Sequence, residues 1–196
     1  MTNVLLTIAL ALITPVKPES GKFTIYQDGK RLGTEQFTIT AIKGGYRAEA
    51  ETQMAGEPEP IKARMELDEQ LNPLSYEYTR GAGTIRVKVD KPLSEIETSA
   101  NGQTSSIDFR FPEGGFIVDN NFFHHFLLLF YKVGLTGSTL SVFVPQDMQM
   151  GSATIRPKGN RTFEFEMGDI KGEATTDVDG RLIKLTVPDA KVTVER

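Results

Sequence analysis

The chain of 196 residues contains no cysteine. This absence excludes disulfide bonds, thiolate metal sites and cysteine nucleophiles, and it excludes the cysteine to which a lipoprotein anchor is attached. Histidine is scarce as well, because the only two histidines are the adjacent residues His124 and His125. Any chemistry that uses an imidazole is therefore confined to one short segment.

No part of the chain concentrates charge of one sign. The 22 basic and 26 acidic side chains are spread evenly and give a formal net charge of −4. A surface that follows nucleic-acid phosphates needs a basic block or stripe, so we expect no nucleic-acid partner. With 39% hydrophobic and 24% charged residues, the composition is that of one globular domain.

The apolar run near the N-terminus is too short to cross a bilayer. It has 11 residues, from Val4 to Thr14, where about 20 are needed. This length suits the core of a signal peptide, and Pro15 and Pro18 would end a helix here. A buried N-terminal helix is the alternative. We favour export: a signal peptide over residues 1–20, one β-rich domain over residues 21–196, and a periplasmic or secreted location.

Apolar and polar residues alternate with a period of two through most of the chain after Ser20. This period is typical of half-buried β-strands, and turn pairs such as Asp28-Gly29 and Asn101-Gly102 separate the segments. The residues expected on the buried face include Phe23, Ile25, Phe37, Ile39, Tyr46, Ala48, Ile61, Met65, Leu67, Leu74, Tyr76, Tyr78, Ile85, Val87, Ile96, Ile107, Phe109, Phe111, Val142, Ile155, Phe163, Phe165, Ile183, Leu185 and Val194.

About a dozen such strands joined by short turns predict an antiparallel meander. Twist accumulates from strand to strand, so a sheet of this size curls around its apolar face. We therefore expect a mainly β fold: a large curved antiparallel meander sheet, a half-barrel or a barrel, whose concave apolar face must be filled.

One stretch breaks the alternation and predicts a helix over residues 120–133. Asp119 is a good N-cap residue and Gly134 a good C-terminal stop. At 100° per residue the phenylalanines and most leucines share one broad arc, and both histidines lie on the opposite arc. The pattern predicts one amphipathic helix packed on the concave apolar face of the sheet.

The histidines do not form a recognisable metal or catalytic motif. Neighbours on a helix point 100° apart, and no Asp, Glu or His stands three or four residues from His124 or His125. We expect no metal and no cofactor. No Gly-x-Ser-x-Gly element is present. A hydrolase that uses His124 or His125, with Asp119 nearby, is the least favoured alternative, so we expect no catalytic residues.

The predicted architecture resembles the lipoprotein-carrier (LolA/LolB-like) fold of bacterial envelopes. The segments "YQDGKRLGTEQFTI", "ELDEQLNPLSYEY" and "DVDGRLIKLTVPDAKVTVER" also resemble uncharacterised exported β-rich bacterial proteins with a "dGk-x-x-G" opening and a "D-x-x-x-x-P-x-x-Y" corner. The resemblance implies an exported protein with a curved sheet and a helix inside it. It supplies no catalytic residues.

Two functions compete for the same apolar side chains. The favoured one is an exported, non-enzymatic binding protein for a lipid or acyl chain held between sheet and helix, with His124 and His125 at a polar rim. A ligand pocket of roughly 300 Å³ or more is then expected. The alternative is a closed structural or protein-interaction module of the cell envelope, with a membrane-proximal partner and a core packed to about 0.75. The oligomeric state is left open. The expected ligand-binding residues are Phe122, Phe126, Leu129, Phe130, Tyr76 and Tyr78.

Overall fold

The computed structural model describes residues 16–196, so most of the predicted signal peptide lies outside the described residues. One α-helix, α1 (His124–Val133), and a 3-10 turn (Gly134–Thr136) interrupt the strands in this range. The strands are β1 (Glu19–Gln27), β2 (Lys30–Ile42), β3 (Gly45–Met54), β4 (Ile61–Asp68), β5 (Pro73–Arg80), β6 (Gly83–Lys88), β7 (Ser94–Ala100), β8 (Gln103–Phe109), β9 (Phe116–Ile117), β10 (Ser138–Val144), β11 (Gln149–Gly159), β12 (Thr162–Met167), β13 (Ile170–Thr176), β14 (Leu182–Val187) and β15 (Val192–Glu195).

All these strands belong to one sheet, in the order β8-β7-β6-β5-β4-β3-β2-β1-β15-β14-β13-β12-β11-β10-β9. Neighbours are antiparallel except β9 and β10, which are parallel. The two ends of the order, β8 and β9, do not pair, so the sheet is curved but open. The predicted half-barrel is confirmed, and the barrel alternative is not.

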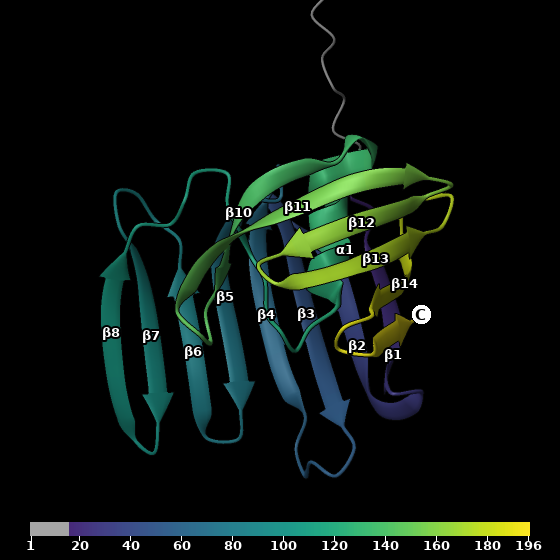
Figure 1. Ribbon diagram of the computed structural model, residues 1–196. Helices are drawn as coiled ribbons and strands as arrows, with labels where there is room; N and C mark the ends of the chain where they lie inside the picture. The colour runs from purple at the N-terminus through teal and green to yellow at the C-terminus, as the bar shows by residue number, and fades with distance from the viewer. Residues whose placement is uncertain (1–15) are drawn as a thin grey trace, which may run out of the picture.

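The helix lies inside the curve of the sheet. Figure 1 shows α1 between β10–β13 in front and β2–β4 behind. Aromatic contacts agree, because the Phe126 ring lies 5.4 Å from that of Phe165 on β12, and the His124 ring lies 6.1 Å from that of Phe37 on β2. The single helix on the concave face is therefore confirmed.

The predicted turn pairs have the backbone that such hairpins need. Asp28 and Gly29 have φ values of 51° and 73°, and Asn101 and Gly102 have values of 53° and 76°. Two successive residues with positive φ are the mark of the type I′ turn, whose twist matches that of the flanking strands.

At two positions a β-bulge places a side chain on the opposite face of the sheet from the one predicted. Leu67 pairs with Pro73 and Glu66 with Ser75, so Leu74 is an extra residue and is 45% exposed. In the same way Thr176 pairs with Leu182 and Thr175 with Lys184, which leaves Ile183 39% exposed. A bulge adds one residue and moves the next side chain to the other face.

The prediction also fails at the far end of the meander. Ile107 has the parity of a buried residue, but it is 54% exposed because β8 is the last strand. Phe111 lies beyond the end of β8 and is half-buried against Phe143, with ring centroids 6.4 Å apart.

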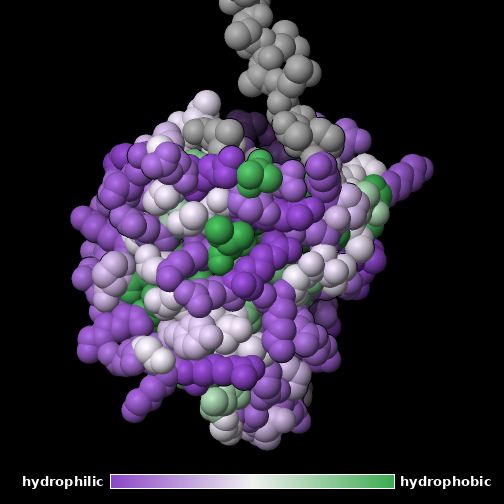
Figure 2. All heavy atoms as spheres, turned by 90° about the vertical axis from the view of Figure 1, so that its right-hand side faces the viewer, coloured by the Kyte–Doolittle hydropathy of each residue, from purple (hydrophilic) through white to green (hydrophobic). Residues whose placement is uncertain are grey.

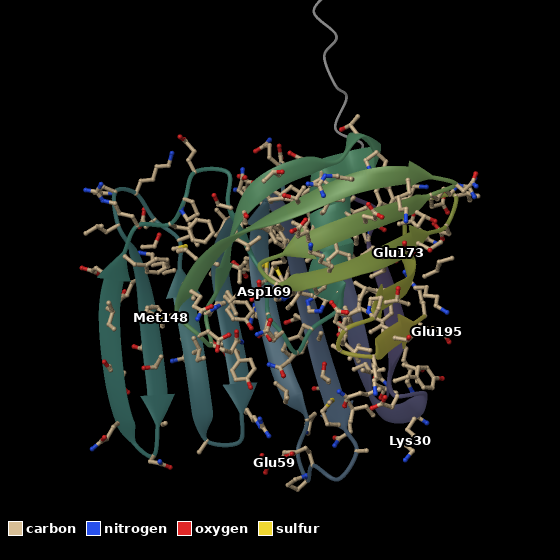
Figure 3. The ribbon with its side chains drawn as sticks, in the orientation of Figure 1. Lys30, Glu59, Met148, Asp169, Glu173 and Glu195 are labelled. Carbon is tan, nitrogen blue, oxygen red and sulfur yellow. The ribbon has the colours of Figure 1, made fainter. Side chains whose placement is uncertain are left out.

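The polar residues of the alternating pattern form the outer surface of the sheet. Figure 2 shows a largely hydrophilic face, with only small, separate hydrophobic areas. In Figure 3 the charged side chains of Lys30, at the start of β2, and Glu59, between β3 and β4, extend outward. The apolar residues are gathered in one core between the sheet and the helix.

Candidate functional site

The six expected ligand-binding residues are brought together in the interior. The structure places Phe122, Leu129 and Tyr76 at 0–1% exposure, and the other three at 4–9%. Their neighbours are side chains of the same chain: Phe130 lies 5.4 Å from Phe163, and Phe122 lies 6.5 Å from Tyr78, measured between ring centroids. The aromatic face of the helix is thus in contact with the sheet.

The two histidines are not at a rim, because the structure buries both completely. They belong to an interior polar cluster, which we define as Glu35, Thr52, Tyr76, Asp119, Asn121, His124, His125 and Gln146. These residues come from three strands, from the segment that leads into α1, from the first turn of α1, and from the loop between β10 and β11. The cluster therefore joins distant parts of the sheet to the start of the helix.

Glu35, on β2, occupies the N-terminus of the helix. Its Oε2 accepts the backbone N–H of Phe123 at 2.6 Å, and its Oε1 accepts that of His124 at 2.9 Å. Its Oε1 also lies 2.8 Å from Nδ1 of His124. A carboxyl group at this place accepts hydrogen bonds from amide groups that lack partners within the helix.

The predicted role of Asp119 as N-cap is wrong. The helix begins at His124, not at 120, and its N-cap residue, Phe123, has no side-chain cap. Asp119 instead makes a turn of its own, in which Oδ1 accepts the Asn121 backbone N–H at 2.7 Å. The cap comes from Glu35, far away in sequence. The predicted stop is confirmed, since Gly134 has φ 62° and its N–H donates to the carbonyl of Phe130.

Asp119 ties the segment before the helix to two other elements. Its Oδ2 accepts hydrogen bonds from the Tyr76 hydroxyl on β5 and from the Gln146 side-chain amide. The backbone N–H of Asp119 donates to Nδ1 of His125 at 3.1 Å, so the neutral imidazole carries its proton on Nε2. Thr52 on β3 adds a hydrogen bond to the carbonyl of Asn121 at 3.1 Å.

Burial controls the protonation of this cluster. It raises the pKa of Glu35 to about 8, although two backbone N–H groups act against the rise. It lowers the pKa of His124 to about 3, and it lowers that of His125 well below its usual value. Burial also raises the pKa of Asp119. At neutral pH the favoured pair is therefore a protonated Glu35 that donates to Nδ1 of a neutral His124.

The cluster connects the strands to the start of α1, but its titratable residues are buried, so a reactant in solvent cannot reach them. His124, His125, Asp119 and Glu35 are each 0% exposed. Their oxygens and Nδ1 atoms are used in hydrogen bonds within the chain, and among residues 16–196 no group of three or more metal-binding side chains could hold a metal ion. Sequence reasoning missed Glu35, yet its parity with Phe37 and Ile39 already placed a carboxylate on the apolar face.

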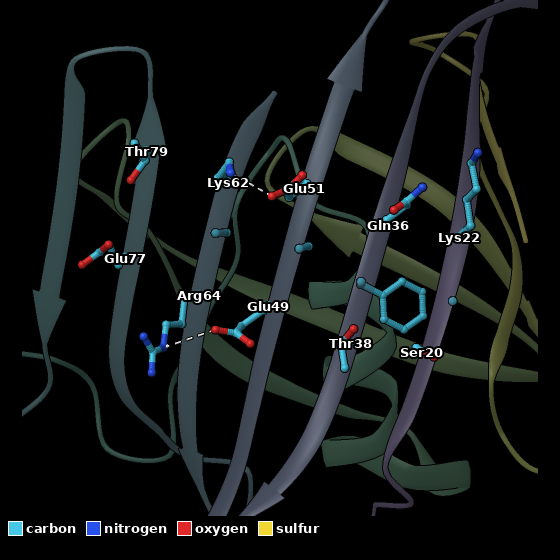
Figure 4. A pocket seen from close by; sticks show the side chains of 14 residues that line it. Ser20, Lys22, Gln36, Thr38, Glu49, Glu51, Lys62, Arg64, Glu77 and Thr79 are labelled. Atoms are coloured by element: carbon cyan, nitrogen blue, oxygen red, sulfur yellow. Dashed lines mark ion pairs between the residues drawn. The ribbon is translucent and has the colours of Figure 1, made fainter. Parts of the chain in front are cut away.

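The outer face of the sheet carries a shallow groove of about 790 Å³ across β1–β5. Figure 4 shows that its walls are polar and that its charges neutralise one another. Lys62 pairs with Glu51 at 2.8 Å, and Arg64 with Glu49 at 3.7 Å. Exposed pairs of this kind contribute little to stability and leave no net charge that would attract an ion.

In structural terms the protein is an open β-meander that curves around one helix. It encloses one interior cluster of hydrogen-bonded polar side chains. Comparisons with family models, with curated proteins and with solved structures found no match. None of the helices formed by residues 16–196 has the length and apolar character needed to cross a membrane.

Proposed function

We propose that the protein is a closed, non-enzymatic interaction module that acts through its surface. The observation that carries this proposal is the contact between the aromatic face of α1 and the sheet. Phe126 and Phe130 meet Phe165 and Phe163 of β12 at ring distances of 5.4 Å, and all four are more than 90% buried. Side chains in such contact are a packed core.

The interior polar cluster supports the same proposal. A catalytic pair needs access to a substrate, but here Glu35 and His124 are buried and hold the start of the helix on β2. Three buried atoms of the cluster, Nε2 of His124, Nε2 of His125 and Oε1 of Gln146, have no partner among the described residues. The remaining polar groups bond one another and so restrict how the elements that they join can be arranged. The cluster is thus best explained as a structural joint.

An apolar ligand between sheet and helix is the competing proposal. The aromatic character of the helix favours it, because Phe122, Phe126 and Phe130 offer a large apolar surface. A lipid would have to separate these rings from β12 and would expose the buried cluster around Glu35. The two proposals therefore differ in whether the helix leaves the sheet.

Native mass spectrometry of protein purified from its own host, with a fluorescent fatty-acid probe in parallel, separates them. We expect the mass of the chain alone and no probe binding. Phe126→Ala is the matched positive control, because it opens space in the core and should admit a small apolar probe. A co-purified lipid, or saturable binding of the fatty acid to the wild type, would contradict a closed interior.

We also propose that the module works outside the cytoplasm, in the periplasm or after secretion, near an envelope partner. The apolar run at residues 4–14 supports export, although it lies outside the described residues. The domain itself begins before residue 20, because Glu19 is part of β1 and accepts a hydrogen bond from Tyr131 at 2.7 Å. N-terminal sequencing of the fractionated protein should find a mature chain that retains Glu19, and recovery of the uncleaved chain in the cytoplasm would contradict export.

A further inference from the structure

The two edges of the sheet are built in opposite ways. At one edge, β9 has two residues, and both are fully buried. At the other edge, β8 has seven residues, of which six are exposed. Edge strands are usually protected by lysine, proline, a bulge or short length. β8 contains neither lysine nor proline, and its seven residues pair with β7 without a shift in register.

An apolar row on the inner face runs out to this edge. Val87 on β6 is opposite Ile96 on β7, and Ile96 is opposite Ile107 on β8. The exposed fraction rises from 2% and 1% to 54% along this row. A further strand with an apolar residue opposite Ile107 would continue the row, since directly opposed side chains are the unit of packing in a sheet.

A row of charges on the outer face also ends here. Glu77, Arg86 and Glu97 are opposite one another on β5, β6 and β7, and Arg86 bonds both carboxylates, at 2.9 and 3.0 Å. This row reaches β8 at the uncharged Ser106. In the neighbouring row Lys88 on β6 is opposite Glu95 on β7, and Glu95 is opposite Asp108 on β8, so two acidic side chains lie side by side at the edge. Asp108 is the only charged residue of β8 and makes no ion pair with the described residues, so a cation opposite it on an added strand would face an acidic pair.

We propose that β8 receives an extended segment of another protein as an added antiparallel strand. The segment alternates basic and apolar residues, with an apolar side chain opposite Ile107 and a lysine or arginine opposite Asp108. Strand addition of this kind takes its affinity from main-chain hydrogen bonds and its specificity from alternate side chains. A second copy fits less well, because its β8 would bring another acidic residue and no cation. This inference rests on the proposed function as an interaction module.

A seven-residue peptide of alternating lysine and valine is the probe. We expect it to bind the full chain and to slow backbone amide exchange in Gln103–Phe109. A glutamate–valine peptide of the same length should not bind. Asp108→Lys should weaken binding of the lysine peptide about tenfold, because an attraction becomes a repulsion. The matched control is Asp169→Lys in the exposed β12–β13 turn (Figure 3), which should leave binding unchanged.

The outcomes separate this inference from the function on which it rests. Equal binding to wild type and Asp108→Lys, protection outside β8, or no binding would overturn it. So would self-association of the chain that protects β8 in place of the peptide. A lipid found in the interior would contradict the proposed closed module. Strand addition at β8 would still be tested by peptide binding, which does not depend on the interior. Ile107→Lys, at an exposed position, is a second variant that should abolish binding without unfolding the protein.

Discussion

Strands β2–β7 and the edge strand β8 belong to one continuous meander, but only the first group buries its inner-face side chains along the row that crosses them. Met65 and Tyr76 lie under the helix and the returning strands and are 0–1% exposed, whereas Ile107, in the same cross-strand row, is 54% exposed. Figure 1 shows β8 at the end of the meander, beyond β10–β13. Alternation thus tells which face a side chain takes, while burial depends on what lies over that face.

The largest effect is expected at the covered end. Phe126→Ala should lower the free energy of unfolding by about 3–5 kcal/mol, because it leaves a cavity beside Phe165. Urea unfolding followed by circular dichroism measures the change. Phe126→Leu keeps most of the volume and should lose less. A loss under 1 kcal/mol for the alanine variant would show that the helix is not packed on the sheet.

The joint between β2 and the helix comes second. Glu35→Ala should cost about 2–4 kcal/mol, because it removes the acceptor for the Phe123 and His124 amides inside the core. Glu35→Gln keeps one acceptor oxygen and should cost less. The same urea experiment tests both, and equal stability of the alanine variant and the wild type would exclude the cap.

The pH dependence of stability is the third prediction. The pKa of Glu35 rises from 4.5 to about 8 on folding, so the folded state holds a proton that the unfolded chain releases, and stability falls as pH rises through this range. The pKa of His124 falls from 6.5 to about 3, so stability falls as pH drops through that range, and His125 acts in the same direction. Above pH 6.5 the histidines are neutral in both states, and Glu35 contributes a slope of at most about 1.4 kcal/mol per pH unit; the raised pKa of Asp119 acts in the same direction as that of Glu35.

Urea unfolding at several pH values should therefore find a loss of stability from pH 6.5 toward pH 8. Glu35→Gln cannot release this proton, so its stability should fall less over the same interval. A wild type whose stability does not change between pH 6.5 and 8 would contradict a protonated Glu35 in the interior.

The smallest effect is expected at the uncovered end. Ile107→Ala should change the free energy of unfolding by no more than about 0.5 kcal/mol, because the side chain is already half in water. In hydrogen exchange of the wild type, the amides of β8 should exchange faster than those of β3 and β4, which have a partner strand on each side. Slow exchange along β8 in the free chain would show that the edge is already occupied.

Much of the fold could be predicted because it depends on local rules. The period of two gives the strands, the Asp28-Gly29 and Asn101-Gly102 pairs give hairpins, and Gly134 ends the helix. The exceptions have local geometric causes. A bulge puts Leu74 outside, and the end of the sheet leaves Ile107 uncovered.

The interior cluster could not be predicted in the same way, because it depends on contacts between distant segments. Glu35 and His124 are 89 positions apart in the sequence, and their contact needs the curvature that brings β2 under the helix. The sequence offers one clue, because Glu35 stands at a position where the alternation expects an apolar residue. It does not indicate that His124 is the partner of Glu35. For the same reason Asp119 was an acceptable N-cap on local grounds, while Glu35 fills that role in the structure.

The pairing of β1 with β15 has a consequence for synthesis of the chain. β1 lies in the middle of the sheet, and one side of it is satisfied only by the last residues, with Ile25 opposite Val194. During synthesis the chain can form the β1–β8 meander early, but the sheet is continuous only when β15 has been made and has paired with β1. Long-range pairing of this kind slows folding. The β1–β8 meander should therefore become resistant to proteases only once β15 has paired with β1, and removal of β15 should leave a central edge open to aggregation.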